Sequence, residues 1–407
     1  MKKIIAALVM VLYTCPASAM TIDECLEEAC ANNPLVIAAK KEADASGAQR
    51  YGNAAALLPR VSAGGLYTRL NEEPPGIDLS SLMVPGAEPP SIAGNPLLQY
   101  RFRNNYSGYL RVTQPLFTGG KMIHALKASH SGMLAKEAAY EAAVEKARVD
   151  TIKAFYGVIT AREMHKLALE AVSQLERHLD RVNNFQKAGT ATEYDSLKTE
   201  VKLLSWKPKA KSAERGMKNA ERNLAITLGR DPFAPVEPEG TLEYEGPMPK
   251  QEELEALRKN AVQNRPEARA AREAVQALEE MKRAQAGNLL PQAAAQYNYN
   301  FLNKNDVLST DSGAWDSWWD IKIMLSWDIF TAGANIMKIK QADDEKAAQE
   351  ERAKLIEARI AAEAGDVFDY VRESEEAVAV WKKNMELAQK GHEIAETKYK
   401  NGSITNT

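Results

Sequence analysis

Four segments of the chain alternate between apolar and polar residues, which is the period of a β-strand whose two faces meet different surroundings. The clearest is WDSWWDIKIMLSWD at 315–328, where alternate positions on one face are mostly aromatic or aliphatic. That face carries Trp315, Trp319, Ile321, Ile323, Leu325 and Trp327, while the other carries mainly Asp, Lys and Ser. The pattern predicts strands at about 59–71, 99–117, 291–303 and 315–330.

Two interpretations of these strands are open. A strand of a soluble sandwich alternates in the same way, because one face packs on a core and the other meets water. The predicted strands, however, reach about ten residues or more, the length that a tilted strand needs to cross a bilayer. Aromatic residues lie near both ends of the apolar faces, and charges and amides occupy the polar faces, as in outer-membrane barrels. We therefore favour a membrane barrel in which Trp319, Ile321, Ile323, Leu325 and Trp327 face lipid.

Very long helical stretches follow these strands. No proline occurs between Leu116 and Lys207, or from Gln292 to the end of the sequence. We expect long helices at about 120–187, 193–229 and 333–400, and we expect Pro208 to kink or interrupt the second. A coiled-coil repeat is present in the first and third of these helices. Its seam is Ala147, Thr151, Ala154, Val158, Ala161, His165, Ala168, Val172 and Leu175, then Ile360, Ala364, Val367, Val371, Ser374, Val378, Trp381, Met385 and Ala388.

The same plan occurs twice in the chain. QPLFTGGK at 114–121 and WDIFTAGA at 327–334 place Phe, Thr and Gly at the same spacing, between a predicted strand and a long helix. LLP precedes a strand in both halves, and KAGTATEYD at 187–195 corresponds to KNGSITNT at 400–407. Each half predicts a helix, two strands and a long helix. The strand-to-helix switches are Phe117, Gly120, Phe330 and Gly333, and the helix turns are Gly189 and Gly402.

The predicted domain organisation follows from this duplication. Residues 1–19 form an export signal with a charged start, an apolar middle and a small-residue cleavage site. A lipoprotein signal at Cys15 is the less favoured alternative. The first structural repeat spans 20–230, a linker rich in Pro, Gly and acids spans 231–262, and the second repeat spans 263–407. The second repeat lacks a counterpart of the 193–229 helix, so we expect a fragment, the alternative being a tube with fewer wall helices.

Composition excludes several other classes of protein. Among 407 residues, 52 Lys and Arg balance 55 Asp and Glu, so nothing indicates a nucleic-acid partner. At i and i+5 on one helix, Cys25 and Cys30 lie beyond the reach of a disulfide, so they are interpreted as unpaired small hydrophobes in preference to a redox pair or metal site. The five histidines share no metal-ligand spacing and are interpreted as ordinary surface or seam residues. We expect no enzyme activity, no metal and no cofactor.

The chain resembles the TolC family of outer-membrane efflux proteins. The resemblance rests on the duplicated order of helices and strands, the LLP sequence before a strand in each half, and the QPLFTGG and WDIFTAG motifs. The fold expected is mainly α with membrane β. The resemblance implies a homotrimer with a 12-stranded β-barrel in outer-membrane lipid, continued by a periplasmic α-helical tube. It implies a passive export duct of a tripartite efflux or type I secretion system. Its partners would be a periplasmic adaptor and an inner-membrane pump of the RND or ABC type.

The strand count supports an assembly independently, because four strands cannot close a barrel and open edges in lipid leave backbone groups unpaired. The alternative function is a periplasmic coiled-coil adaptor, which shares the helical rod but lacks strands with aromatic girdles.

The resemblance also implies a constriction at the periplasmic mouth. In the family, a Tyr before the second helix turn and acids after each turn close the channel and select cations. Tyr399 and Asp195 match those positions. For Asp195 the alternative is a residue in the first turn of a helix, where its charge favours the helix dipole.

Overall fold

The computed structural model describes residues 20–72, 102–242, 250–303, 307–308, 310–311 and 314–400. The predicted export signal at 1–19 and the turn residue Gly402 lie outside the described residues. The chain divides into two compact units. One consists of Met1–Asp44, Ala135–Ala271 and Arg352–Thr407, and the other of Ala45–Leu134 and Arg272–Glu351.

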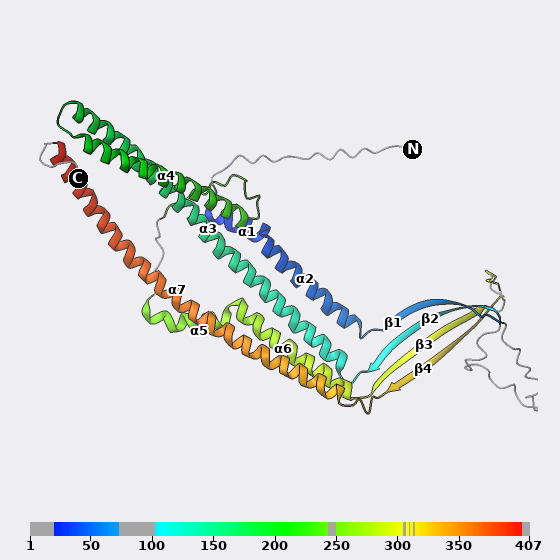
Figure 1. The fold of residues 1–407 in the computed structure, drawn as a ribbon. Helices are drawn as coiled ribbons and strands as arrows, with labels where there is room; N and C mark the ends of the chain where they lie inside the picture. The colour runs from blue at the N-terminus through cyan, green and yellow to red at the C-terminus, as the bar shows by residue number, and fades with distance from the viewer. Residues whose placement is uncertain are drawn as a thin grey trace, which may run out of the picture. The chain divides into compact units, whose positions relative to one another are not determined.

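The order of elements is repeated in the two halves of the chain (Figure 1). The first half contains α1 (Ile22–Asn32), α2 (Pro34–Ala55), β1 (Arg60–Arg69), β2 (Asn104–Phe117), α3 (Lys121–Lys187) and α4 (Glu193–Thr227). The second contains η3 (Gln251–Glu253), α5 (Leu254–Asn264), α6 (Pro266–Ala286), η4 (Gly287–Leu289), β3 (Gln292–Asn303), β4 (Trp315–Ser326) and α7 (Ala334–Lys400). Helix, two strands and a long helix therefore occur twice, as the sequence predicts.

The strands form one antiparallel sheet in the order β1-β2-β3-β4. Two strands are shorter than the alternating pattern predicts. β2 begins at Asn104, which pairs with Arg69 at the end of β1, and the described residues just before it, 102–103, are not strand. Positions 99–101 of this prediction lie outside the described residues. β4 ends at Ser326, which pairs with Gln292 at the start of β3, and not at 330. A strand ends where its hydrogen-bonded neighbour in the sheet ends. The alternation of apolar and polar residues does not show which strand is that neighbour or where it ends.

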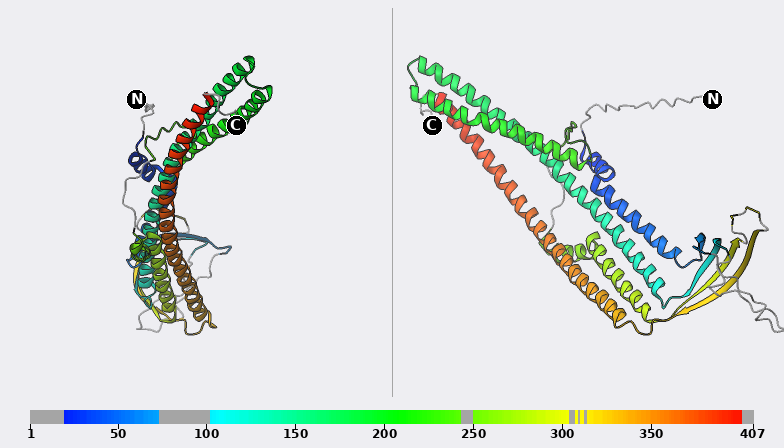
Figure 2. Two further views of the ribbon diagram at one scale, coloured as in Figure 1. Left: turned by 90° about the vertical axis from the view of Figure 1, so that its left-hand side faces the viewer. Right: turned by 45° about the vertical axis from the view of Figure 1, so that its right-hand side comes forward.

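The predicted seam of α3 is buried at five of its nine positions and half-buried at the other four. Ala147, Thr151, Ala154, Val158 and Ala168 are each at most 9% exposed. Small residues on this seam let helices approach closely, and α4 lies antiparallel beside α3 (Figure 2). Several contacts join α3 to α4: Ser196 Oγ donates to Asn183 Oδ1 at 2.7 Å, and Lys207 Nζ lies 3.6 Å from Glu176 Oε1. The guanidinium of Arg162 also lies 3.2 Å from Glu221 Oε1.

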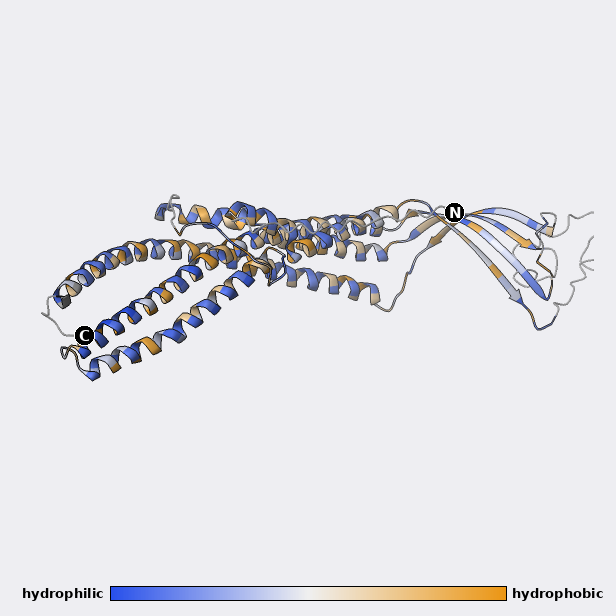
Figure 3. Ribbon diagram, turned by 90° about the horizontal axis from the view of Figure 1, so that it is seen from above, coloured by the Kyte–Doolittle hydropathy of each residue, from blue (hydrophilic) through white to orange (hydrophobic). Residues whose placement is uncertain are grey.

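The predicted seam of α7 is buried over only part of its length. Ile360 is 4% exposed, whereas Val378, Trp381 and Met385 are each more than half exposed in the single chain. Apolar and polar residues are interspersed along the long helices, with no wholly apolar stretch (Figure 3). None of the described helices has the length and apolarity needed to cross a membrane.

Pro208 does not interrupt α4, so this part of the prediction is wrong. The helix runs without a break from Glu193 to Thr227 with Pro208 inside it. A proline removes one hydrogen bond and crowds the preceding turn. Here Leu203 and Ala210, on either side of Pro208, are both buried, and their packing holds the helix together.

A compact core forms where α1, α3 and the end of α4 meet. Cys25, Phe155, Val158 and Leu224 are at most 2% exposed and belong to one hydrophobic cluster. Arg162 of α3 donates to the carbonyl oxygens of Val236 and Pro238 at 3.1 Å or less, and so holds the first part of the linker on this core. The linker is thus anchored to the helices by an arginine that sequence reasoning did not single out.

Cys25 and Cys30, the cysteines among the described residues, form no disulfide, as the sequence predicts. Cys25 is buried, and burial raises the pKa of its thiol to about 11. Since the thiolate is the reactive form, Cys25 should be inert near neutral pH.

We therefore predict slow labelling of Cys25 by a maleimide at pH 7 to 8 in the folded protein. The measurement uses Cys30→Ser and Cys25→Ser in a Cys15→Ser background, so that each variant keeps one thiol. Cys25 should react at least about tenfold more slowly than Cys30 before unfolding, and the two should become equal in denaturant. Equal rates in the folded protein would show that the cluster around Cys25 opens freely.

Candidate functional site

The register of the sheet gathers apolar residues on one face. Ala63, Leu110, Tyr299 and Trp319 form one row across the four strands. The neighbouring row is Val61, Val112, Tyr297 and Ile321. Ring stacking joins the two rows, since Tyr297 and Trp319 have ring centroids 6.2 Å apart and an interplanar angle of 28°. The face is continuous across the sheet.

The residues predicted to face lipid are exposed in the single chain. Trp319, Ile321, Ile323 and Leu325 lie on this apolar face of β4 and are 63 to 75% exposed. Trp327 is 56% exposed but lies beyond the end of β4, where its indole N–H donates to the Leu289 carbonyl oxygen at 3.1 Å. A contiguous apolar surface of this kind is characteristic of a membrane or protein contact.

Aromatic residues gather at the end of the sheet away from the helices. Phe301 and Trp315 make an edge-to-face contact with centroids 6.2 Å apart. Together with Tyr299 and Ser317 they line a shallow cavity of about 410 Å³. Aromatic belts at the boundary of the apolar band are typical of membrane barrels.

Two strand glycines make room for aromatic rings of neighbouring strands, Gly108 on the apolar face and Gly64 on the opposite face. A Cβ at Gly108 would lie 2.1 Å from Cε2 of Phe301, and a Cβ at Gly64 would lie 2.6 Å from the Tyr109 ring. Sequence reasoning did not single out either glycine. The available signal was a glycine inside a strand, which often marks close approach of a neighbouring group.

The two strand-to-helix switches share one backbone conformation. Gly119 and Gly120 have φ of 62° and 82°, and Ala332 and Gly333 have φ of 48° and 82°. Two successive left-handed residues turn the chain from strand to helix, which explains the repeated Gly at Gly120 and Gly333. Phe117 and Phe330 are 50% and 86% exposed, so neither packs into a core of the single chain.

The first switch also packs against η4. A Cβ at Gly119 would lie 2.4 Å from the carbonyl oxygen of Gly287, so only glycine fits there. Lys121 Nζ donates to Asn288 Oδ1 at 2.9 Å next to this contact. The start of α3 and the entry to β3 are therefore joined, which fixes where the sheet leaves the helices.

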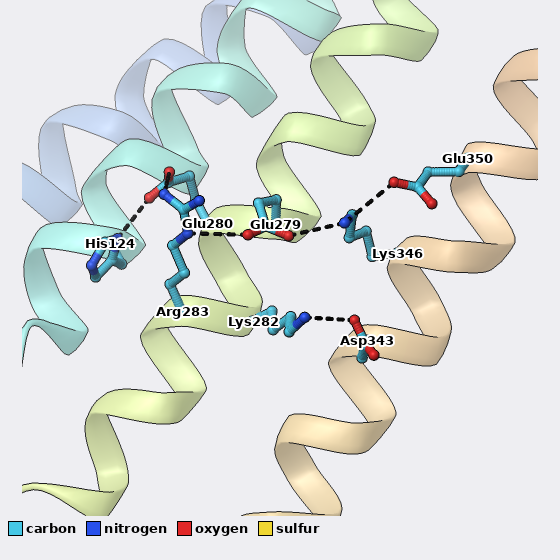
Figure 4. Close-up of polar contacts among 8 residues, drawn as sticks. All are labelled: His124, Glu279, Glu280, Lys282, Arg283, Asp343, Lys346 and Glu350. Carbon is cyan, nitrogen blue, oxygen red and sulfur yellow. Dashed lines mark hydrogen bonds and ion pairs between the residues drawn. The ribbon is translucent and has the colours of Figure 1, made fainter.

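Charged side chains link the helices next to the sheet (Figure 4). Glu280 of α6 has a side chain that is only 6% exposed and is contacted from two sides. His124 Nδ1 of α3 lies 2.7 Å from Glu280 Oε2, and Arg283 donates to Oε1 at 3.1 Å. His124, which sequence reasoning interpreted as an ordinary residue, therefore connects α3 to a buried carboxylate.

The same ladder continues from α6 to α7. Lys346 Nζ lies 3.1 Å from Glu279 Oε2, and Lys282 Nζ lies 2.7 Å from Asp343 Oδ1. The hydrogen bond from Lys346 lowers the pKa of Glu279, and the hydrogen bond from Lys282 lowers the pKa of Asp343. Both carboxylates are thus held ionised by cations on the neighbouring helix.

The predicted helix turn contains Gly189, in the left-handed region at φ 77°. Thr192 and Asp195 then form a capping box at the start of α4. Asp195 Oδ2 accepts from the Thr192 hydroxyl at 2.6 Å and from its N–H at 3.1 Å, and the Asp195 N–H donates back to Thr192 Oγ1 at 3.2 Å. The side-chain hydrogen bond from Thr192 lowers the pKa of Asp195.

This geometry gives Asp195 the capping role that the sequence offered as the alternative to an aperture. Tyr399 belongs to the last turn of α7, but its side chain lies outside the described residues, as does Gly402. Among the described residues, no group of His, Cys, Asp or Glu is arranged to hold a metal ion.

Comparison with models of known protein families assigns the chain to one of them. The model of the outer membrane efflux protein family matches residues 25–230, and the chain belongs to that family. Comparison with curated protein sequences finds no significant match. The chain is accordingly an outer-membrane efflux duct with a periplasmic extension, as the resemblance to the TolC family predicts.

Solved structures share the fold. The outer-membrane channel OprN matches with a TM-score of 0.75 at 17% identity, over 94% of this chain and 81% of that one. The CmeC outer membrane channel of Campylobacter jejuni matches with 0.74 at 16% identity, over 94% and 77%. The open state of the MtrE channel of Neisseria gonorrhoeae matches with 0.73 at 18% identity, over 94% and 80%.

The ladder between α6 and α7 predicts acid sensitivity. Because the folded pKa of Glu279 is lowered, its pair with Lys346 stabilises the protein above the unfolded carboxyl pKa. That contribution is lost as the pH falls through the folded pKa. Glu279→Gln should cost at most about 1 kcal/mol near pH 7, and this cost should vanish in acid.

Thermal melting followed by circular dichroism at pH 7 and pH 3 checks this. Glu375→Gln, at an exposed position of α7, is the matched control and should change neither curve. An equal loss for Glu279→Gln at both pH values would contradict the ion pair.

Proposed function

We propose that the chain works as a homotrimeric duct of a tripartite efflux or type I secretion system. One observation supports the trimer above others: among the described residues, the four-stranded sheet has an exposed apolar face and two edges, β1 and β4, that pair with no further strand. Backbone groups at an edge cannot remain unpaired in lipid. Pairing of β4 with β1 of the next copy satisfies both edges, and three copies give a 12-stranded closed barrel.

The helices continue this duct in the proposal. Each chain supplies α3, α4 and α7 to the wall of a periplasmic tube, and the partly exposed α7 seam then packs against other helices of the assembly. The duct itself carries out no chemical step. A periplasmic adaptor connects it to an inner-membrane pump of the RND or ABC type, which supplies the energy for export.

We propose that residues 1–19 are removed on export. The first described residue then begins the mature chain in a bonded position, since the Met20 N–H donates to the Glu237 carbonyl oxygen at 2.9 Å. The Glu239 N–H donates to the Met20 carbonyl oxygen at 2.9 Å as well. These contacts hold the start of the proposed linker, 231–262, on the first proposed repeat, 20–230. The second proposed repeat spans 263–407.

The facing of β4 can be tested by two neighbouring substitutions. Ile323→Arg puts a charge on the lipid face and should cost roughly 2–4 kcal/mol, with loss of trimers from outer-membrane fractions. Lys322→Gln, on the opposite face of the same strand, should assemble normally. Trimers are measured by light scattering after detergent extraction. Equal assembly of both variants would mean that the facing is wrong, and recovery of the wild-type protein outside the membrane would favour the adaptor alternative.

We also propose that Asp195 and Tyr399 lie at the periplasmic mouth. Three Asp195 carboxylates, one from each chain, would form a ring that attracts cations. The bonds from Thr192 that lower the pKa of Asp195 support a ring that remains charged below neutral pH, although repulsion within the ring opposes this.

The capping role and the mouth role separate in a pair of variants. Asp195→Asn removes the charge and should weaken cation selectivity, whereas Thr192→Ala removes the cap and keeps the charge, so selectivity should persist. Tyr399→Phe should loosen the closed state by removing a hydroxyl contact. Single-channel currents in a salt gradient provide the measurement. Unchanged selectivity in Asp195→Asn would leave Asp195 as a helix cap alone.

A further inference from the structure

The face of the sheet opposite the apolar face carries a connected row of polar side chains. Ser62, Arg111, Asn298 and Asp320 are paired in register across the four strands. Arg111 Nε donates to Asn298 Oδ1 at 2.9 Å, and Asn298 Nδ2 donates to Asp320 Oδ2 at 2.8 Å. The guanidinium of Arg111 also lies over the ring of Tyr109, 4.7 Å from its centroid.

The next row towards the helices adds two cations. It consists of Arg60, Thr113, Gln296 and Lys322. Lys322 Nζ lies 3.1 Å from Asp320 Oδ2, and its side chain is 59% exposed. Arg60 is exposed as well. The two rows therefore hold three cations, Arg60, Arg111 and Lys322, against a single carboxylate, Asp320.

That carboxylate is fully engaged within the network. Asp320 Oδ2 accepts from Asn298 and faces Lys322, and Oδ1 accepts from Asn300 Nδ2 at 3.2 Å. One carboxylate can balance only one of the three cations. Because the register of the strands fixes the positions of Arg60, Arg111 and Lys322, the excess positive charge stays at one level of the sheet.

We propose that these two rows form a cationic belt around the lumen of the barrel, where they bind anionic groups of solutes that enter it. The proposal rests on the proposed function, because only closure of the trimer turns the polar face into a lumen. Rings of cationic side chains select anions in pores, and a low-dielectric wall strengthens their field. The belt has the opposite sign to the proposed ring of Asp195.

The competing explanation is that the rows only stabilise the sheet. It suits Arg111, which is held by Asn298 and Tyr109. It suits Arg60 and Lys322 less well, since both are exposed and Asp320 is the only charged partner of Lys322 in the described part of the sheet. The test therefore substitutes Arg60 and Lys322 and leaves Arg111 in place.

The experiment measures block of single-channel current by two probes of similar size, a sulfated cyclodextrin and an amino-substituted cationic cyclodextrin. Each is added from the side of the strand-connecting loops to the full chain in a planar bilayer. Wild-type channels should be blocked about tenfold more tightly by the sulfated probe, and this preference should shrink as salt rises. The double variant Arg60→Gln, Lys322→Gln should lose the preference.

The matched control is Arg69→Gln, which removes a cation from β1 at a position on the other face of the strand. It should keep the wild-type preference. If the double variant does not assemble, Lys322→Gln alone should still reduce the preference for the sulfated probe by about threefold.

The outcomes separate the two proposals. Wild-type channels that conduct but are blocked equally by both probes would overturn the belt and leave the duct intact. The same holds if the double variant, or Lys322→Gln alone, keeps the full preference. A wild-type protein that reaches the membrane but conducts no current would overturn the proposed duct, and the belt with it.

Discussion

The need to satisfy backbone hydrogen bonds in lipid is the constraint on which the rest of the structure depends. A bilayer core offers no partner to an unpaired N–H or C=O group, so a sheet in it must close on itself. The four strands of this chain have a face suited to lipid and two open edges. Folding of the membrane part is therefore inseparable from assembly in this account, and the duplicated plan supplies two hairpins to each copy.

The transition from sheet to helix is the second requirement, because a barrel strand has to continue into a tube wall. Successive left-handed residues at Gly119–Gly120 and at Ala332–Gly333 make the same turn in both halves. At the first switch the turn also packs against the backbone of Gly287. The charges on α3, α6 and α7 then tie the helices together just beyond the sheet. In a protein that exports solutes, such ion pairs and hydrogen bonds position the helices of the tube wall without a large apolar core.

Sequence periodicity predicted the parts of the fold that depend on local pattern. Alternation gave the two faces of β4, and the repeated Phe, Thr and Gly marked both switches. Periodicity could not report the ends of β2 and β4, which depend on where their partners end, or the continuity of α4 through Pro208, which depends on packing around it.

The site residues missed by the sequence all act through contacts between distant segments. Gly64 and Gly108 make room for Tyr109 and Phe301 on neighbouring strands, and Arg162 holds the linker. No spacing along the chain reports such contacts. For Asp195, the sequence offered a capping role beside an aperture role, and the capping box gives the first a geometric basis.

Pairing between the open edges of neighbouring copies can be measured by cysteine cross-linking in a background without native cysteines. One cysteine is placed on β4 and another is moved in turn along β1. Edge pairing predicts covalent dimers and then trimers at alternate β1 positions, with no larger species, because a ring of three copies leaves no free edge. Only monomers, or a ladder extending beyond trimers, would contradict the closed barrel.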